Sequence, residues 1–534
     1  MINVRPGRLP KPAGSSGGGR QPSSAPLIYP APKMGLITTA GLADEISGAA
    51  AVLDNWLPTL RGARIRGGSA KAGLVEDLTS LISAFRYKFA TVEKLFMSTS
   101  SAIYDVSNPP ALPDAITPDV DSLTGGDWST FQHANSSGGY LIAVNGQDER
   151  QVFDGAAWST TPEITFEDGD ATTSATFSHG WVFKKREFFI KAGTLDAYYL
   201  SLTDNIGGEA KVFPLGGEFS KGGSLITGFT WSFESGDGPN SYCVFVTSEG
   251  EAVVYAGSDP EADFAKVGVY QLGKPLGKNA YLPINGDVLV CTIPGLRSMS
   301  SVLQRGTDQP ALSQAIEEEW SRAAVSTGDG WRMTWWEEQN LILISFPPTV
   351  VVPDTTFVLH SQTKCWSFIR NWPANCFGTR EGRLFFGGLE GFIWSADATG
   401  SDDGQPFQST YLSQFIAAGK FGQRKAASLA QMYFRGKEAP NVMLFARADG
   451  DTSIPTQSSV TVGNQNASVW DIGLWDVAVW DEVSSLQRFN YRQNVRAHGE
   501  TLAVGCAVTS SGPYQLTLQI DLATLQTHAG EMVA

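Results

Sequence analysis

Pairs of short apolar segments, each pair joined by a polar or glycine-containing turn, recur along the middle of the chain. Aliphatic and aromatic residues fill the segments, and turns such as Asn145-Gly146, Glu249-Gly250 and Glu390-Gly391 separate them. This pattern is typical of β-hairpins, because β-branched and aromatic residues favour strands and Asn-Gly favours tight turns. Seven hairpins are predicted, and they begin at Leu95, Leu141, Phe188, Val244, Val288, Leu341 and Leu384.

The seven predicted hairpins recur at nearly regular intervals. Successive starting points lie 43 to 56 residues apart, which is close to the length of a four-stranded blade of a β-propeller. The predicted fold class is therefore all-β, with a β-propeller of six to eight blades over residues 95–404. A large β-sandwich, or two stacked sandwiches, also contains many hairpins, but such folds do not require a regular spacing.

The segments on either side of 95–404 predict three further parts. Residues 1–35 are rich in Pro, Gly and Ser and lack an apolar signal core, so a flexible N-terminal arm is expected. Residues 36–94 are expected to join the propeller to a platform domain. A polar linker near residue 400 precedes residues 405–534, where alternating strands predict a smaller, sandwich-like all-β platform. Helices are expected only over Leu312–Ala324 and Ala43–Trp56.

Charge is distributed unevenly along the chain. The net charge is −15, yet residues 1–95 hold 12 Lys and Arg against 6 Asp and Glu, so the rest of the chain is strongly acidic. An acidic body does not fit a protein that grips nucleic acid over its whole surface, because phosphate contacts need Lys and Arg. It does fit a surface past which DNA moves without sticking, since like charges repel.

The residue types that carry chemistry form no recognisable cluster in the sequence. The five cysteines are odd in number and lack CxxC spacing, so a reduced compartment and free thiols are expected, including at the closest pair, Cys365 and Cys376. The five histidines show no metal-binding spacing, and the Asp-rich turns complete no calcium loop. No catalytic residue, cofactor or metal is therefore predicted. No apolar run is long enough for a transmembrane helix.

Three tryptophan–aspartate pairs lie close together near the C-terminus. Trp470, Trp475 and Trp480 are each followed by Asp. Repeat proteins named for this dipeptide carry it once per blade, so the spacing of five residues excludes that family. Two interpretations stay open. The tryptophans form part of the core of the platform domain, or they form an aromatic surface for protein–protein contact, where Trp is enriched.

A basic stretch near the N-terminus carries a family resemblance. In "LDNWLPTLRGARIRGG", Trp56 and Pro58 precede Arg61, Arg64 and Arg66. The stretch resembles a signature of the tail nozzle proteins of short-tailed phages, also called packaged-DNA stabilisation or tail hub proteins. Further segments resemble the same family in the same order over residues 35–440. They include "LFMSTSSAIYDVSNP", "PINGDVLVCTIPGLRSMSSVLQ", "FVLHSQTKCWSFIRNWPANCF", "LFFGGLEGFIWSADATGSDDGQPF" and "FGQRKAASLAQMYFRG".

The resemblance implies both a fold and a role. Members of this family combine a β-propeller with a platform domain and assemble as a ring, usually a hexamer, beneath the head–tail adaptor of the portal complex. The ring extends the DNA channel, holds packaged DNA without reading its sequence, and meets a tail needle or distal fibre or spike proteins. The implied location is the virion tail, assembled in the host cytoplasm. The implied protein is structural and not an enzyme.

The same resemblance gives the basic stretch an expected function. Arg61, Arg64 and Arg66 are expected to pair with acidic surface on the same or a neighbouring subunit, with Trp56 and Pro58 anchoring the turn. Together with the three tryptophans at 470, 475 and 480, these residues form the predicted assembly surface. The competing hypothesis is a receptor-binding or glycan-depolymerising tail protein on a propeller scaffold, whose paired carboxylates would come from different blades.

Overall fold

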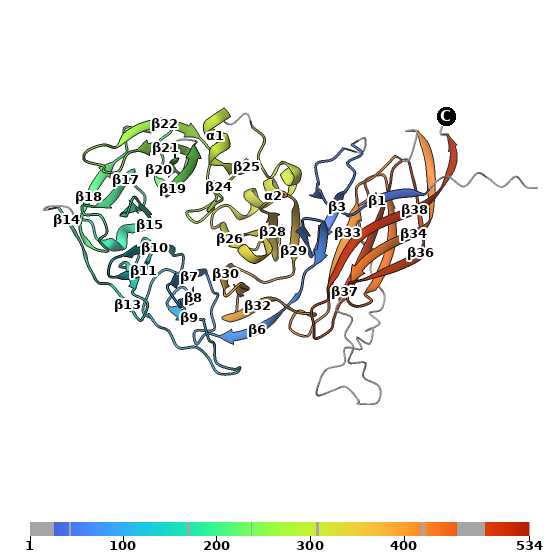
Figure 1. The fold of residues 1–534 in the computed structure, drawn as a ribbon, viewed down its shortest axis with the longest axis horizontal. Helices are drawn as coiled ribbons and strands as arrows, with labels where there is room; N and C mark the ends of the chain where they lie inside the picture. The colour runs from blue at the N-terminus through green and yellow to red at the C-terminus, as the bar shows by residue number, and fades with distance from the viewer. Residues whose placement is uncertain are drawn as a thin grey trace, which may run out of the picture.

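The computed structural model describes residues 26–41, 44–167, 171–235, 238–305, 309–417, 422–455 and 486–532. These residues form two β-rich parts that lie side by side, a propeller and a sandwich (Figure 1). No helix among them is long and apolar enough to cross a membrane.

The propeller has seven blades, which confirms the predicted fold class and fixes its blade number. Each blade is a small, mainly antiparallel sheet whose first strand lies nearest the axis. Blades 1 to 4 comprise β7 (Ser83–Phe89), β8 (Val92–Ser98) and β9 (Ile103–Asp105); β10 (Ser129–Asn135), β11 (Gly138–Val144), β12 (Gln151–Phe153) and β13 (Trp158–Ser159); β15 (Phe177–Phe183), β16 (Arg186–Lys191), β17 (Asp196–Leu200), β18 (Gly208–Pro214) and β14 (Ile164–Phe166); and β19 (Leu225–Ser235), β20 (Gly238–Thr247), β21 (Glu251–Ala256) and β22 (Ala265–Gln271).

The remaining three blades complete the ring. They comprise β23 (Tyr281–Ile284), β24 (Asp287–Thr292) and β25 (Gly295–Ser298); β26 (Arg332–Trp336), β27 (Leu341–Ser345), β28 (Thr355–His360) and β29 (Trp366–Arg370); and β30 (Cys376–Arg380), β31 (Arg383–Gly387), β32 (Phe392–Thr399) and β6 (Gly68–Leu74). The inner strands β23, β26, β30 and β7 contact one another in turn, as do β10, β15 and β19. Contacts of β11 with β7 and of β19 with β24 close the circle.

All seven predicted hairpins are present, and each one is the middle pair of strands of a blade. The seven starting residues fall in β8, β11, β16, β20, β24, β27 and β31. Middle strands are sandwiched between neighbouring blades, so both of their faces are apolar and the sequence signal is strong. All five residues of β27 are buried, for example, whereas the outer strand β22 is exposed along its first half.

The seventh blade is closed by a strand from the N-terminal part of the chain. β6 pairs with β32, with Leu74 opposite Phe392 and Gly73 opposite Ile393. The propeller therefore begins at Gly68 and not at residue 95, and the predicted joining segment 36–94 in fact supplies β6, β7 and part of β8. Closure by a distant strand is invisible to a search for local hairpins, because the partner lies more than 300 residues away in the sequence.

The sandwich has two sheets. The first, called the outer sheet here, consists of β36 (Gln487–Gly499), β34 (Gln423–Gly436), β38 (Leu518–Met532), β5 (Gly62–Ile65) and β4 (Trp56–Thr59), with β1 (Leu27–Pro30) also paired to β38. The second contains β3 (Ala49–Asp54), β33 (Phe407–Ser413), β37 (Leu502–Ser510) and β35 (Asn441–Ala448), with β2 (Gly35–Leu36) on β3. β3 also pairs with β29, so the second sheet is continuous with blade 6.

The core of the sandwich runs without a break into the propeller. Met432 and Phe434 of the outer sheet face Val504 and Cys506 of the second sheet, and the same buried cluster includes Trp320 and Trp366 beside blade 6. Residues 405–534 do form a β-sandwich, as predicted, but β1 to β5 contribute to it as well. The predicted flexible arm 1–35 therefore ends in strands, and residues 1–25 lie outside the described part of the chain.

Helices are few, and one of the two predicted helices is absent. α2 (Glu317–Thr327) confirms the predicted helix near Leu312, with Glu317 to Glu319 at its positive N-terminal end and Trp320 buried. The other helices are α1 (Met299–Arg305) and the 3₁₀ turns η1 (Ser174–Thr176), η3 (Gln314–Ile316) and η4 (Glu337–Gln339). The helix predicted over Ala43–Trp56 is wrong: its alanine-rich half is strand β3, because pairing with β33 outweighs the helical preference of alanine.

Candidate functional site

The basic stretch Leu53–Gly68 lies at the joint between the sandwich and the propeller. The chain leaves the second sheet at Asp54 and reverses through Asn55, which adopts a left-handed conformation with φ of 61°. It then forms the hairpin β4–β5 of the outer sheet and enters blade 7 through Gly67 and Gly68. One short segment therefore connects three sheets, and its arginines lie where these sheets meet.

Arg66 is completely buried at this joint and is held on every side. Its Nη1 and Nη2 donate to the two carboxylate oxygens of Asp402 at 3.0 and 2.7 Å, and its Nε donates to Asn55 Oδ1 at 2.9 Å. The guanidinium plane also lies 3.9 Å from the ring centre of Phe407 and 4.9 Å from that of Trp372. A bidentate ion pair between aromatic faces is the geometry that a planar guanidinium favours.

Arg64 makes a second bidentate pair a few residues away. Its Nη1 and Nη2 donate to Asp397 at 3.2 and 2.8 Å, and Nη2 also donates to Gln339 Oε1 at 3.2 Å. The side chains of Arg64 and Asp397 are only 17% and 8% exposed. Asp397 is at the end of β32 and Asp402 follows it, so both pairs attach the basic stretch to the segment that leads from blade 7 into the sandwich. Together the two pairs are called the double clamp here.

The predicted assembly residues have different environments. Trp56 and Pro58 are buried, as expected for anchors of the turn. Arg64 and Arg66 were expected on an assembly surface, and this expectation is corrected: their acidic partners lie within the same chain and leave them little or no exposed surface. Arg61 alone is exposed. Trp470, Trp475 and Trp480 lie outside the described residues, so their predicted role stays a prediction.

Two features of the joint could not be recognised in the sequence. The side chain of Asn55 accepts hydrogen bonds from Arg66 and from the backbone N–H of Arg370, and it donates to the carbonyl of Gln408. Gly68 lies so close to the chain that a Cβ atom there would be 2.0 Å from the carbonyl oxygen of Ser401. The paired glycines after Arg66 therefore allow two backbone segments to approach closely.

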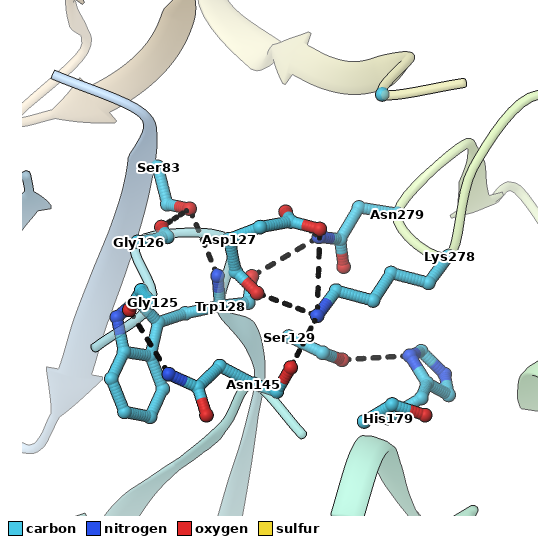
Figure 2. A network of polar contacts seen from close by, with 12 residues as sticks. Ser83, Gly125, Gly126, Asp127, Trp128, Ser129, Asn145, His179, Lys278 and Asn279 are labelled. Carbon is cyan, nitrogen blue, oxygen red and sulfur yellow. Dashed lines mark hydrogen bonds and ion pairs between the residues drawn. The ribbon is translucent and has the colours of Figure 1, made fainter. Parts of the chain in front are cut away.

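A second polar network crosses the axis of the propeller. A cavity there is lined by residues of the inner strands of five blades, including Ala84, Tyr281 and Cys376. Figure 2 shows Lys278 and Asn279, which precede blade 5, reaching toward Asp127, which precedes blade 2. Lys278 Nζ donates to the Asp127 carbonyl at 2.5 Å and lies 3.4 Å from its carboxylate.

Arg332 extends this network to blade 6. Its guanidinium forms an ion pair with Asp127 and donates to Ser83 Oγ of blade 1 at 2.9 Å. Burial by itself would raise the pKa of Asp127, but the nearby Arg332 and Lys278 outweigh it, so the pKa lies below its usual value. Charged groups from blades on opposite sides of the axis thus brace the ring from within. This network is a candidate for stiffening the propeller.

His179 ties three inner strands together near the same axis. Its Nε2 donates to the carbonyl of Gly228 at 2.7 Å, and its Nδ1 accepts from Ser129 Oγ at 2.7 Å (Figure 2). Both contacts suit the neutral ring, because a carbonyl needs a donor while the Ser129 hydroxyl can donate. Complete burial lowers the pKa of His179 to about 4.

Neutral His179 predicts a stability that falls in acid. The unfolded chain takes up a proton at this residue below pH 6.5, whereas the folded chain resists it down to about pH 4. Between these values the protein is expected to lose about 3 kcal/mol of unfolding free energy at this residue alone. Urea denaturation of the wild type and of His179→Gln from pH 7 to pH 4 would measure it. The pH slope should be shallower in His179→Gln, and the exposed His498→Gln variant should keep the wild-type slope.

A buried ion-pair triad connects blades 2 and 3. Glu187 is fully buried on β16, with His133 Nδ1 2.9 Å from one carboxylate oxygen and Arg150 Nη1 3.1 Å from the other. Arg150 also donates to the carbonyls of Ile206 and Pro162, each at 2.5 Å. Burial raises the pKa of Glu187, although its two partners act in the opposite direction. The triad lies inside the protein and fills a structural role.

The other candidate groups follow the sequence expectations where the structure describes them. All five cysteines are buried free thiols, including Cys365 and Cys376, which belong to different blades. Within the described ranges, no three His, Cys, Asp or Glu side chains come together in a group that could hold a metal ion.

Comparison with known proteins identifies only distant similarity in fold. No protein-family model matches this chain. No curated protein is similar to it in sequence. Among solved structures, YCF48 from Cyanidioschyzon merolae is 10% identical with a TM-score of 0.36, over 62% of this chain and 98% of that one. BamB from Moraxella catarrhalis is 9% identical with a TM-score of 0.31, over 62% and 97%.

A computationally designed protein, Ika8, shows a similar level of likeness. It is 7% identical with a TM-score of 0.35, over 61% of this chain and 99% of that one. Similarities at this level carry no information about activity or partners. The propeller is established by the strand pairing described above, and the function has to be argued from the residues of the chain itself.

Proposed function

We propose that this chain is a structural subunit of the tail nozzle of a short-tailed phage. In this role it forms a ring beneath the head–tail adaptor, extends the DNA channel, retains packaged DNA and lets it pass on ejection. The tail needle or the distal fibre or spike proteins are its other partners. The proposed location is the virion tail, after assembly in the host cytoplasm.

The double clamp is the observation that carries this proposal. The stretch with the strongest family resemblance, Leu53–Gly67, forms the joint between propeller and sandwich. Its two arginines are held by two bidentate pairs, one of them fully buried on the arginine side. A ring that contains DNA under pressure needs subunits whose two parts do not hinge, and a buried, multiply bonded joint resists hinging.

Two further features support the same role. The second sheet of the sandwich is continuous with blade 6 through β29 and β3, so the two parts share a backbone connection as well as side-chain contacts. The cross-axis ion pairs of Asp127 stiffen the propeller itself. The body of the chain is also acidic, which suits a wall along which DNA slides without binding.

The proposal is tested by locating the chain in intact particles. Antibody raised against residues 405–534 and labelled with gold is expected to decorate the single tail vertex in electron micrographs. Particles assembled without the chain are expected to package DNA and then lose it, as measured by the ratio of full to empty heads. Gold on fibres or spikes, with DNA retained in particles that lack the chain, would instead support a receptor-binding or glycan-depolymerising protein.

A further inference from the structure

The outer sheet of the sandwich presents a row of arginines on the face that points away from the core. Its edge strand β36 alternates residues that face the sandwich core, such as Val495, with exposed ones. Arg488, Arg492 and Arg496 are all exposed and are four residues apart, so they project from the same face at intervals of about 14 Å. β36 is also an edge of its sheet and has no strand beyond it.

The row continues into a hollow on the same sheet. Lys33, Arg61 and Arg435 line this hollow together with Asp521. Asp521 lies 3.0 Å from Arg435 and 3.6 Å from Arg488, and it makes no ion pair with the other cations of the row. The basic face is defined here as Lys33, Arg61, Arg435, Arg488, Arg492 and Arg496. Six cations thus surround one carboxylate, and among the described residues neither Arg492 nor Arg496 forms an ion pair.

Such a face is unusual on this chain because the rest of the protein is acidic. The most uneven region is residues 95–183, which hold twelve Asp and Glu residues and a single basic residue, Arg150. Arg150 is buried against Glu187 and leaves the surface charge of this region uncompensated. The region forms most of blades 1 and 2, and its exposed carboxylates include Asp114, Asp119, Asp121, Asp154, Glu163 and Glu167. It is called the acidic sector here.

We infer that the basic face binds the acidic sector of a second copy of this chain. The two surfaces have opposite charge, and arginine pairs with carboxylates through two parallel hydrogen bonds, as it does twice in the double clamp. The sandwich lies at one side of the molecule and blades 1 and 2 lie in the propeller (Figure 1). The contact therefore joins different surfaces of the two copies, and repeated contacts of this kind close into rings.

This inference rests on the proposed function and deepens it, since it names the surfaces through which the nozzle subunits meet. Its test uses the purified full chain, so that it does not depend on where the protein lies in a virion. Self-association is measured by sedimentation velocity at 50 and 500 mM NaCl. Contacts between exposed charges weaken with salt, so the wild-type association constant is expected to fall about tenfold or more between these conditions.

Charge reversal on the basic face supplies the specific test. The triple variant R488E/R492E/R496E alters only exposed side chains and is expected to weaken self-association at 50 mM NaCl about tenfold or more. The control variant K274E/R322E/R383E changes the net charge equally at exposed positions outside the basic face, and it is expected to associate more nearly like the wild type. Circular dichroism and the thermal midpoint confirm that each variant is folded.

Complementation identifies the partner surface. The variant D114K/D119K/D121K reverses three exposed carboxylates of the acidic sector, and by itself it is also expected to associate weakly. An equal mixture of this variant with R488E/R492E/R496E is expected to recover association, because each reversed surface then meets a complementary one. Association of the R488E/R492E/R496E variant at the wild-type level would overturn the inference.

Two other outcomes also overturn the inference and leave the proposed function separately testable. The first is a wild-type chain that stays monomeric at 50 mM NaCl up to 100 µM. The second is binding of a 30-base-pair DNA duplex that is lost in R488E/R492E/R496E while self-association is unchanged, which would make the basic face a nucleic-acid surface. In either case gold at the tail vertex would still support a nozzle, with subunit contacts elsewhere.

Discussion

Replacing Arg66 by alanine is expected to destabilise the protein by about 3–5 kcal/mol, as is usual when one partner of a buried ion pair is removed. The variant leaves the Asp402 carboxylate without the guanidinium that binds both of its oxygens, and Asn55 loses a donor. It also leaves a space between Phe407 and Trp372. Urea denaturation followed by tryptophan fluorescence would measure the shift of the unfolding midpoint.

Two matched variants show whether the effect belongs to the clamp. Arg61→Ala removes an exposed arginine of the same stretch and should change the unfolding free energy by no more than about 0.5 kcal/mol. Arg66→Lys keeps the charge but loses the fork that binds Asp402, so it should lie between the wild type and alanine. Equal midpoints for Arg66→Ala and Arg61→Ala would show that the joint does not depend on Arg66.

Removal of Arg150 is expected to have a similarly large effect in the propeller. Arg150→Ala leaves Glu187 fully buried with only His133 as a partner, and the expected loss is about 3–5 kcal/mol at pH 8. Because burial already raises the pKa of Glu187, the carboxyl can take up a proton and avoid part of the cost. The loss measured by urea denaturation should therefore be smaller at pH 5 than at pH 8.

An apolar replacement of the whole pair separates the cost of the orphaned charge from the value of the pair. The double variant R150M/E187L is expected to be more stable than Arg150→Ala, because no buried charge is left unpaired. A double variant that is as unstable as Arg150→Ala at pH 8 would mean that lost packing, and not the uncompensated Glu187, dominates. The exposed Arg383→Ala provides the surface control.

The sequence predicts those parts of the fold that local patterns determine. The seven hairpins were visible because middle strands are apolar on both faces, as in β27, and because their turns are short. The two-residue strand β13 and the polar strand β22 gave no such signal. The strands β1 to β6 were missed as members of the sandwich and propeller, since their partners are more than 300 residues away.

The candidate site shows the same division. The basic stretch was singled out from its composition, but its partners Asp397 and Asp402 occupy an ordinary-looking polar turn. Only the closure of blade 7 brings them to Arg64 and Arg66. The prediction that the arginines pair with carboxylates was therefore correct in chemistry and wrong in exposure. Asp127, Lys278 and Arg332 carried no signal at all, because a contact across a propeller axis has no fixed spacing in sequence.

The closure of blade 7 by β6 also determines when the protein can fold during synthesis. The strands β1 to β6 leave the ribosome first, yet β32, β33 and β38, with which they pair, are translated last. Blades 1 to 6 can collapse in the order in which they emerge, but the ring stays open and the leading strands stay unpaired until translation is nearly complete. The nascent chain therefore carries unprotected strand edges for most of its synthesis, which is the period in which chaperones matter most to it.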